Sequence, residues 1–324
     1  MNINHLVVNS SIAQGLDVIG DRWSLLILRD AFLGRQRFEE FRRHTGASRA
    51  TLSRRLNALV AEGVLQKHAY GEGSSRFEYR LSEKGRALFP VSLLAWQWEL
   101  EWGGAAYRDA LPYTLLHTHC GQPMHPVAVC GHCHEPITLG SMALPTVARD
   151  TEQQIAAIKS LSGQRRVRVS QSTGEEDLAM AGISDLIGDR WTLLILICAF
   201  FGTRRYDGFL KQLGIASNIL TDRLNLLSAV NVFERKSYQT NPPRYEYQLS
   251  KKGLSLYPII IALRQWAVDW RPQGEVLTLT HKSCGQALKI EVQCGSCEML
   301  AEQQDVQFAA SSPAAQETEG ELPA

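Results

Sequence analysis

Leucines recur at helical spacing in one segment of the chain, SRATLSRRLNALVAEG. At about 100° per residue, Leu52, Leu56 and Leu59 fall on one side, and polar residues occupy the other. Ser48 stands at the N-cap position, and Gly63 stands where the chain can turn out of the helix. The pattern predicts an amphipathic helix whose leucine face packs against a core.

The patterns on either side predict a helix–turn–helix, a hairpin and a long terminal helix. Apolar content predicts two helices upstream, and Phe38 with Phe41 predicts a short positioning helix that Thr45 and Gly46 separate from the leucine helix. Two downstream segments predict the strands of a hairpin, or wing. From Ser82 onward, an apolar stripe at spacings of three and four predicts one long helix. The expected elements span residues 10–19, 21–33, 38–43, 48–63, 64–70, 76–81 and 82–102, and the stripe consists of Leu88, Val91, Ala95, Trp98 and Trp102.

The whole pattern occurs twice. The sequence DVIGDRW at residues 17–23 recurs 168 positions later as DLIGDRW, and the same offset pairs Arg55 with Arg223 and Trp102 with Trp270. The stripe of the long helix also returns, as Leu256, Ile259, Leu263, Trp266 and Trp270. We therefore expect the two copies to pair through their long helices within one chain, although tryptophans also serve as ordinary core fillers.

The length of 324 residues fits two domains, each with its own core. The predicted fold class is mainly α with small β-hairpin wings. The expected division is 1–105 winged helix-turn-helix, 106–140 zinc-ribbon-like module, 141–176 flexible linker, 177–273 second winged helix-turn-helix, 274–302 second zinc-ribbon-like module and 303–324 disordered tail.

Charge favours nucleic acid as a partner only locally. The formal net charge of the chain is +1, but residues 35–67 carry eight basic residues against three acidic ones. No apolar run is long enough to span a bilayer, and the first residues do not resemble a secretory signal. We expect a cytoplasmic protein with no membrane partner.

Several ordered blocks resemble the HxlR-type family of bacterial winged-helix transcriptional regulators. They are IGDRW at 19–23, LSRRL at 52–56, RFEY at 76–79 and LSEKG at 81–85, and the resemblance covers roughly residues 10–103 and again 178–271. It implies dimers that bind short inverted repeats in double-stranded DNA and pair through their terminal helices. The tandem arrangement departs from that pattern, so a pseudo-dimeric monomer and a homodimer both remain open.

The resemblance also raises the question of thiol sensing. Some relatives respond to electrophiles or oxidants through a cysteine near the N-terminus, and that region has none here. Cys198 lies in the apolar run LLILICAF, which predicts a buried structural cysteine. Apolar surroundings would raise the pKa of its thiol and shield it from reagents. The sequence does not specify an effector.

The outer face of each leucine helix supplies the candidate DNA contacts. An arginine or asparagine there can bond a base edge in the major groove, and flanking arginines can neutralise phosphates. The alternative is an amphipathic surface helix with solvated arginines. The candidates are Ser48, Arg49, Ala50, Thr51, Ser53, Arg54, Arg55, Asn57 and wing residue Arg76 in the first copy, and Ser217, Asn218, Thr221, Asp222, Arg223, Asn225 and wing residue Arg244 in the second.

The second helix keeps the leucine face and changes the outer one. Its stripe is Leu220, Leu224 and Leu227, whereas Asp222 stands in place of Arg54. A carboxylate is repelled by phosphates but accepts a hydrogen bond from cytosine N4. The second copy therefore reads a different half-site or has a weakened DNA contact.

Each copy is followed by a cysteine module with the same spacing, His-x2-Cys-x9-Cys-x2-Cys. Three cysteines and a histidine complete a tetrahedral zinc site, so we expect one structural, non-catalytic zinc ion in each module. The competing interpretation is a redox dithiol, although such centres need no third cysteine. The expected ligands are His117, Cys120, Cys130 and Cys133 in the first module and His281, Cys284, Cys294 and Cys297 in the second.

Together these features favour a sequence-specific DNA-binding transcriptional regulator that acts as an intramolecular pseudo-dimer on an imperfect inverted repeat and holds two zinc ions. The alternative is a zinc-dependent protein-interaction adapter whose winged helices no longer bind DNA. We predict no enzymatic activity, because no paired carboxylates, nucleophile–base set or phosphate loop stands out in the sequence.

Overall fold

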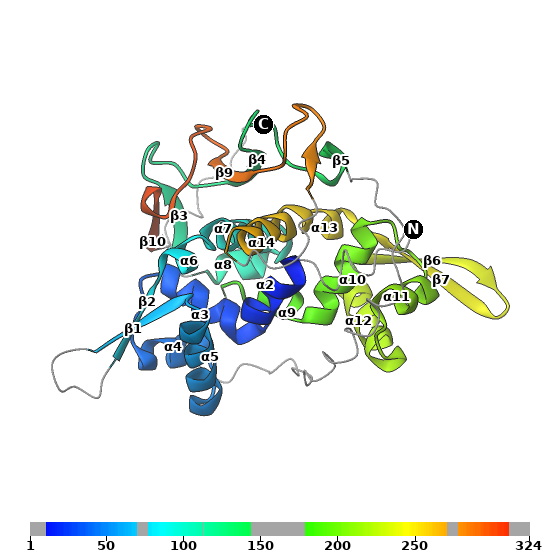
Figure 1. The fold of residues 1–324 in the computed structure, drawn as a ribbon, viewed down its shortest axis with the longest axis horizontal. Coiled ribbons are helices and arrows are strands. Elements are labelled where there is room, and N and C mark those ends of the chain that lie inside the picture. The colour runs from blue at the N-terminus through cyan, green and yellow to red at the C-terminus, as the bar shows by residue number, and fades with distance from the viewer. Residues whose placement is uncertain (1–10, 70–76, 112, 144–178, 271–277, 311–324) are drawn as a thin grey trace, which may run out of the picture.

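The computed structural model describes residues 11–69, 77–111, 113–143, 179–270 and 278–310. Helices form the body of the molecule, and the strands form short antiparallel pairs (Figure 1). The predicted fold class is confirmed. None of the helices in the described segments is long and apolar enough to cross a membrane.

The first copy contains the expected helix–turn–helix and wing. Its leucine helix, α5, begins after the N-cap Ser48, whose hydroxyl accepts a hydrogen bond from the backbone N–H of Thr51, and Leu52, Leu56 and Leu59 are fully buried. Its elements are α2 Ser11–Ile19, α3 Arg22–Phe32, α4 Phe38–Thr45, α5 Arg49–Ala61, β1 Leu65–Ala69, β2 Phe77–Leu81, α6 Glu83–Arg86, α7 Phe89–Trp102 and α8 Ala105–Asp109.

The second copy repeats this order. Its leucine helix α12 buries Leu220, Leu224 and Leu227, and its wing is longer than the described part of the first. Its elements are α9 Ala181–Ile187, α10 Arg190–Phe200, α11 Tyr206–Leu213, α12 Ser217–Ala229, β6 Phe233–Thr240, β7 Pro243–Leu249, α13 Lys251–Leu254 and α14 Tyr257–Trp270.

The predicted long terminal helix is interrupted in both copies. Ser82 caps the short α6, and a new helix, α7, begins at Phe89, with Pro90 in its first turn. The expectation of one continuous helix was wrong because a proline lacks the backbone N–H and its ring collides with the carbonyl of the preceding turn. Pro258 stands in the corresponding place in α14.

The two copies pack against each other through α7 and α14, with α2 of the first copy also on α14. The tryptophan contacts are reciprocal: Trp98 Nε1 donates to the carbonyl of Lys252 at 3.2 Å, and Trp266 Nε1 donates to the carbonyl of Lys84 at 2.9 Å. Each lysine ammonium group also lies near the ring of the tryptophan that bonds its backbone. The stripe residues Trp98 and Trp266 thus join the copies.

Ion pairs repeat this reciprocity at the other end of the junction. Arg22 pairs with Asp185, and Arg190 pairs with Asp17. Both arginines are almost completely buried, whereas their aspartate partners remain accessible to solvent, so the two pairs lie at the edge of the junction. The backbones of Asp21 and Asp189 form an antiparallel bridge between them.

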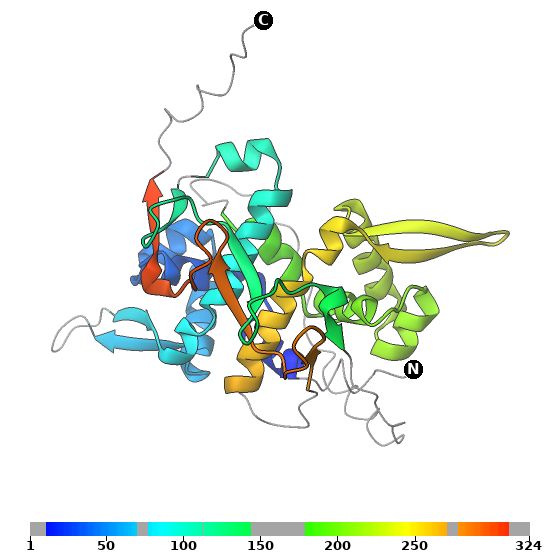
Figure 2. The same ribbon diagram turned by 90° about the horizontal axis from the view of Figure 1, so that it is seen from above.

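The cysteine modules exchange strands across the same junction. Residues of β4 Pro126–Cys130 pair with β9 Ile290–Cys294, with Ala128 opposite Val292. Strand β3 Tyr113–His117 pairs with β10 Val306–Ala310, and β5 Met142–Ala143 pairs with β8 Thr280–His281. Figures 1 and 2 show the intertwined strands lying over α7 and α14. Two separate ribbon modules were therefore the wrong expectation.

The exchange also corrects the predicted domain ends. The expected disordered tail starts with a turn, η3 Gln303–Asp305, and the strand β10, which gains its hydrogen-bonding partner only from the first module. The expected linker likewise begins with residues of η1 Leu139–Ser141 and β5. The rest of the tail and of the linker lies outside the described residues.

Candidate DNA-reading surfaces and metal centres

The outer face of α5 presents unengaged polar side chains. Arg54 and Asn57 are exposed, directly opposite the buried leucines, and within the described residues neither side chain makes a hydrogen bond or an ion pair. Arg49 differs, because its guanidinium lies 2.6 Å from a carboxylate oxygen of Glu39 on α4. That exposed pair contributes little stability and leaves Arg49 able to exchange partners. The candidates Ser53 and Ala50 share the exposed face.

Two predicted contact residues, Arg55 and Arg223, are partly buried and engaged by aspartates of the fold. Arg223 forms a double hydrogen bond with Asp189, with both distances 2.7 Å, and Arg55 lies 3.2 Å from Asp21. The aspartates cap α10 and α3, so these arginines fasten each recognition helix to the helix behind it. Their recurrence at one offset, together with that of the aspartates, was the sequence signal for this pairing.

The second recognition helix has a weaker start and an acidic outer face. Its N-cap is Ala216, which offers no side-chain acceptor, whereas Tyr206 donates from its hydroxyl to the carbonyl of Ser217 at 2.9 Å. Asp222 and Asn218 are exposed. Exposed Asn225 and Thr221 complete the predicted set. The surface retains hydrogen-bonding groups but lacks the cation that Arg54 supplies.

The wings extend to opposite ends of the molecule (Figure 1). Arg76 lies outside the described residues, and Arg244 is exposed on β7. The predicted contacts did not include Arg235 and Lys236, which are exposed on β6. The guanidinium of Arg235 lies 4.1 Å from the centre of the Tyr245 ring, so an aromatic contact holds this cation on the wing. Two consecutive basic residues in a wing strand were the signal for it.

All eight predicted metal ligands gather into two groups of four, but each group combines both modules. One contains His117, Cys120, Cys294 and Cys297, and the other contains Cys130, Cys133, His281 and Cys284. The predicted division into one ligand set per module was wrong. The strand exchange is the reason, because it carries the second cysteine pair of each module across to the other.

The geometry of both groups fits a tetrahedral ion. In the first, His117 Nδ1 lies 3.5 Å from Cys120 Sγ and 3.3 Å from Cys297 Sγ. The second repeats this arrangement, with His281 Nδ1 lying 3.3 Å from Cys133 Sγ and 3.5 Å from Cys284 Sγ. Zinc bond lengths require N···S separations of about 3.5 Å and S···S separations of about 3.8 Å. The donor atoms of each group lie within 4.8 Å of one another, so both groups can hold a metal ion.

The electrostatics of the buried cysteines favour the ligand form. Burial raises the pKa of Cys130, but hydrogen bonds, including those from the backbone N–H groups of His132 and Cys133, lower it by more. The net pKa therefore lies below that of an ordinary thiol. Cys294 shows the same balance. A metal ligand must be the thiolate, so these backbone groups prepare the site.

Cys198 is confirmed as a buried cysteine. It lies on α10 with no solvent exposure, and burial raises the pKa of its thiol. Such a thiol has little thiolate at neutral pH and is poorly suited to react with oxidants.

Several proteins with similar sequences are described as HTH-type transcriptional regulators. The uncharacterized HTH-type transcriptional regulators Mb3122 of Mycobacterium bovis and Rv3095 of Mycobacterium tuberculosis are each 39% identical over 137 residues, which are 42% of this chain and 85% of the relative. The regulator sll1512 of Synechocystis sp. is 35% identical over 92 residues, which are 28% of this chain and 68% of the relative. Each of these relatives is much shorter than this chain.

Two solved structures also match part of the chain. Two candidate transcription factors, PA1374 from Pseudomonas aeruginosa and PA1607, are 29% and 32% identical, with TM-scores of 0.33 and 0.36; each match covers 40% of this chain and 88% or 92% of the other. The model of the HxlR-like helix-turn-helix family matches residues 18–107 and 186–275, which together exceed half of the chain. The protein therefore belongs to the HxlR-like helix-turn-helix family, in two tandem copies.

Proposed function

We propose that this protein is a sequence-specific DNA-binding transcriptional regulator whose two copies act as one intramolecular pair on an imperfect inverted repeat. The observation that carries the proposal is the outer face of α5, where Arg54 and Asn57 are exposed and unengaged opposite fully buried leucines. The similarity to HTH-type transcriptional regulators supports it.

The reciprocal junction supports the intramolecular pair. The contacts of Trp98 and Trp266 and the buried arginine pairs use one residue from each copy, so the junction needs no second chain. Pairing of this kind presents α5 and α12 on the side away from the cysteine strands (Figure 1). A two-fold arrangement of recognition helices suits half-sites about one DNA turn apart.

Binding to DNA is tested by selection from a random oligonucleotide pool, followed by titration of the selected operator and of random DNA at several salt concentrations. The affinity should fall steeply with salt, because bound phosphates release counterions, and Arg54→Ala with Asn57→Ala should reduce the preference for the operator over random DNA. An unenriched pool and salt-independent binding would instead favour the protein-interaction adapter.

We further propose that the two ligand groups hold one structural zinc ion each. Three thiolates and an imidazole are a donor set that zinc prefers, and four protein ligands leave no open position for a reacting water. Each ion joins segments far apart in the sequence, such as Cys120 and Cys297. The sites therefore fasten one copy to the other rather than closing a small local loop.

Paired cysteine substitutions distinguish the exchanged sites from self-contained ones. In the exchanged arrangement, Cys120→Ser with Cys297→Ser damages one site and should leave one zinc ion per chain, whereas Cys120→Ser with Cys133→Ser damages both and should leave none. Self-contained modules predict the reverse result. Elemental analysis of folded protein gives the ratio, and loss of both ions in every pair would show that the sites do not load independently.

A further inference from the structure

We propose that the structural metal sites also control this regulator: loading them with a thiophilic divalent cation, with Zn²⁺ as the reference ion, strengthens operator contact mainly by the first recognition helix. This inference rests on the proposed DNA-binding function and concerns how that function is controlled. A strand pair, two ring contacts and a shared pocket lead from one metal group to the first helix–turn–helix, and the second copy lacks the key residues of this route.

The first step leads from the metal group into a strand pair. His117 is the last residue of β3, and Cys297 precedes β10 in the other module, so the two ligands of one group hold the same end of this pair. Toward the far end of the pair, the edge of one ring meets the face of the other between Tyr113 and Phe308, with the ring centres 5.9 Å apart. The ion would therefore fix the position of both rings.

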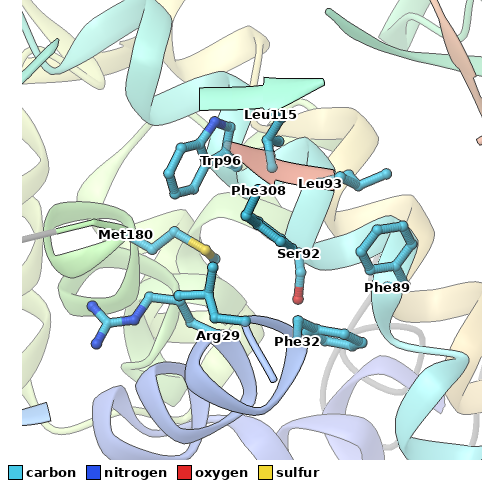
Figure 3. A pocket seen from close by; sticks show the side chains of 10 residues that line it. Arg29, Phe32, Phe89, Ser92, Leu93, Trp96, Leu115, Met180 and Phe308 are labelled. Atoms are coloured by element: carbon cyan, nitrogen blue, oxygen red, sulfur yellow. The ribbon is translucent and has the colours of Figure 1, made fainter. Parts of the chain in front are cut away.

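The second step leads from the strands to α7 and α3. The ring of Trp96 on α7 stacks on Tyr113 with the centres 5.2 Å apart. Figure 3 shows Trp96, Leu115 and Phe308 along one side of a small pocket, with Arg29 of α3 facing them. Met180 reaches the same pocket from the start of the second copy.

The third step leads from Arg29 to the recognition helix. Arg29 is only 2% exposed, and its Nη2 donates to the carbonyl of His44 at 3.0 Å, in the last turn of α4. Its Nη1 donates to the carbonyl of Ala179, at 2.6 Å, just before α9 of the second copy. Arg29 thus ties the turn between α4 and α5 to the junction between the copies.

The second copy cannot relay a signal in this way. The positions equivalent to Arg29 and Trp96 are occupied by Ile197 and Arg264. The Ile197 side chain cannot donate a hydrogen bond to a carbonyl at the end of α11. Buried Ile260 occupies the position equivalent to Ser92, which borders the pocket of the first copy. We therefore expect metal binding to act on α5 much more than on α12.

The physical basis is the small core of the exchanged modules. Their strands are short, and a module of this size depends on its metal ion for folding. Without the ion, the ligands no longer hold β3 against β10, and the contacts of Tyr113 and Phe308 with α7 weaken. The positioning helix then loses its fixed support, and the ordering of α5 has to be supplied by DNA binding itself.

The test uses the full chain, stripped of metal with a chelator under reducing conditions and then reloaded. Affinity for the selected operator is measured by fluorescence anisotropy for the metal-free chain and after addition of Zn²⁺, Cd²⁺ or Mg²⁺. Zn²⁺ and Cd²⁺ should raise the affinity about tenfold, a typical size for coupling between sites, and Mg²⁺ should not, because it prefers oxygen ligands. Hydrogen exchange should slow on α4 and α5 with zinc, and much less on α11 and α12.

A matched pair of variants tests the route without touching a ligand. Leu115 lines the pocket, and Leu279 is its buried counterpart in the second module. Leu115→Ala and Leu279→Ala should both bind two zinc ions, but only Leu115→Ala should reduce the zinc effect on operator affinity to about twofold or less.

The outcomes separate this inference from the proposed function. If the metal-free and zinc-loaded chains bind the operator equally tightly, control by the metal sites is overturned and DNA binding stands. If neither chain prefers operator over random DNA, both proposals fail. An equal loss of the zinc effect in the two leucine variants would overturn the route through the first copy.

Discussion

The junction between the copies and the two DNA-reading surfaces have diverged to very different extents. At the junction, Trp98 with Lys252 and Trp266 with Lys84 make the same bond twice. On the reading surfaces, the position that Arg54 occupies on α5 is occupied by Asp222 on α12. A junction residue has a buried partner in the other copy that would be left unpaired by its loss, whereas an exposed side chain carries no such penalty. The tryptophan contacts of the junction are therefore symmetric, whereas the proposed reading surfaces are not.

One buried junction contact breaks the symmetry. Glu99 of α7 accepts hydrogen bonds from the backbone N–H groups of Gly182 and Ile183 at the start of α9, at 2.8 and 3.2 Å. Its counterpart in the second copy is Ala267, against which Gly15 of α2 packs closely. A carboxylate thus anchors one copy where a methyl group packs against the other. The junction is symmetric in its tryptophans and not in this carboxylate.

The largest effect should come from breaking the symmetric contacts. Trp98→Ala and Trp266→Ala each remove a buried ring and its hydrogen bond to a backbone carbonyl of the other copy, so each should lower the free energy of unfolding by about 3–5 kcal/mol. Chemical denaturation measures both, and the two costs should agree to within about 1 kcal/mol. Trp102→Ala at the partly exposed end of α7 is the control and should cost less. Clearly unequal costs would contradict the reciprocal junction.

The asymmetric contact should make stability depend on pH. Burial raises the pKa of Glu99 to about 7, against hydrogen bonds from Ile183 and Gly182 that lower it. The folded protein therefore binds a proton more tightly than the unfolded chain, so this group lowers stability as the pH rises from about 4.5 to about 7. Relative to wild type, Glu99→Gln should gain up to about 3 kcal/mol across that range.

Denaturant unfolding at several pH values measures this gain. Exposed Glu101 supplies the control, because Glu101→Gln should keep the pH profile of the wild type. A parallel profile for Glu99→Gln and wild type would mean that the carboxyl group titrates normally in the folded protein.

The sequence predicted the elements that depend on local patterns. The Ser48 cap of α5, the leucine faces of α5 and α12, the helix–turn–helix and the wings all follow from spacing and from turn residues. Pro90 is a local signal for the break between α6 and α7. It was overlooked because the apolar stripe continues across that break. Periodicity defines a common face, but it does not establish that the helix is continuous.

The exchange of the metal ligands could not be predicted from spacing. Both modules carry the same four residues at the same separations, so a set within one module and a set shared between modules have identical patterns. The choice is made by tertiary pairing, in which β10 finds β3 from the far end of the chain. Arg223 is different, because its pairing with Asp189 was available from the repeated positions of both residues.

Unequal reading surfaces predict unequal losses of specificity. Arg54→Ala and Asn57→Ala should each cost about 1–3 kcal/mol of discrimination between operator and random DNA, because each removes a base contact. Asp222→Ala and Asn225→Ala, the same positions on α12, should cost less. Anisotropy titrations against both DNAs measure the difference, and equal losses from the two helices would show that the surfaces contribute alike.

The smallest effect, and the sharpest test of the asymmetry, should come from Asp222→Arg. The exposed carboxylate of Asp222 is repelled by phosphates, whereas an arginine there would restore the side chain that α5 presents at Arg54. Because the copies are joined covalently, binding of α5 places α12 beside the second half-site at a high effective concentration, so even a weak contact contributes.

The natural protein should select an imperfect inverted repeat, and Asp222→Arg should select a more symmetric one with a gain of about 1 kcal/mol. Selection from a random pool compares the two, with Asp222→Asn as the control that removes the charge and adds no cation. A perfect palindrome selected by the natural protein and left unchanged by the substitution would mean that two chains pair through their first copies, and that α12 does not read bases.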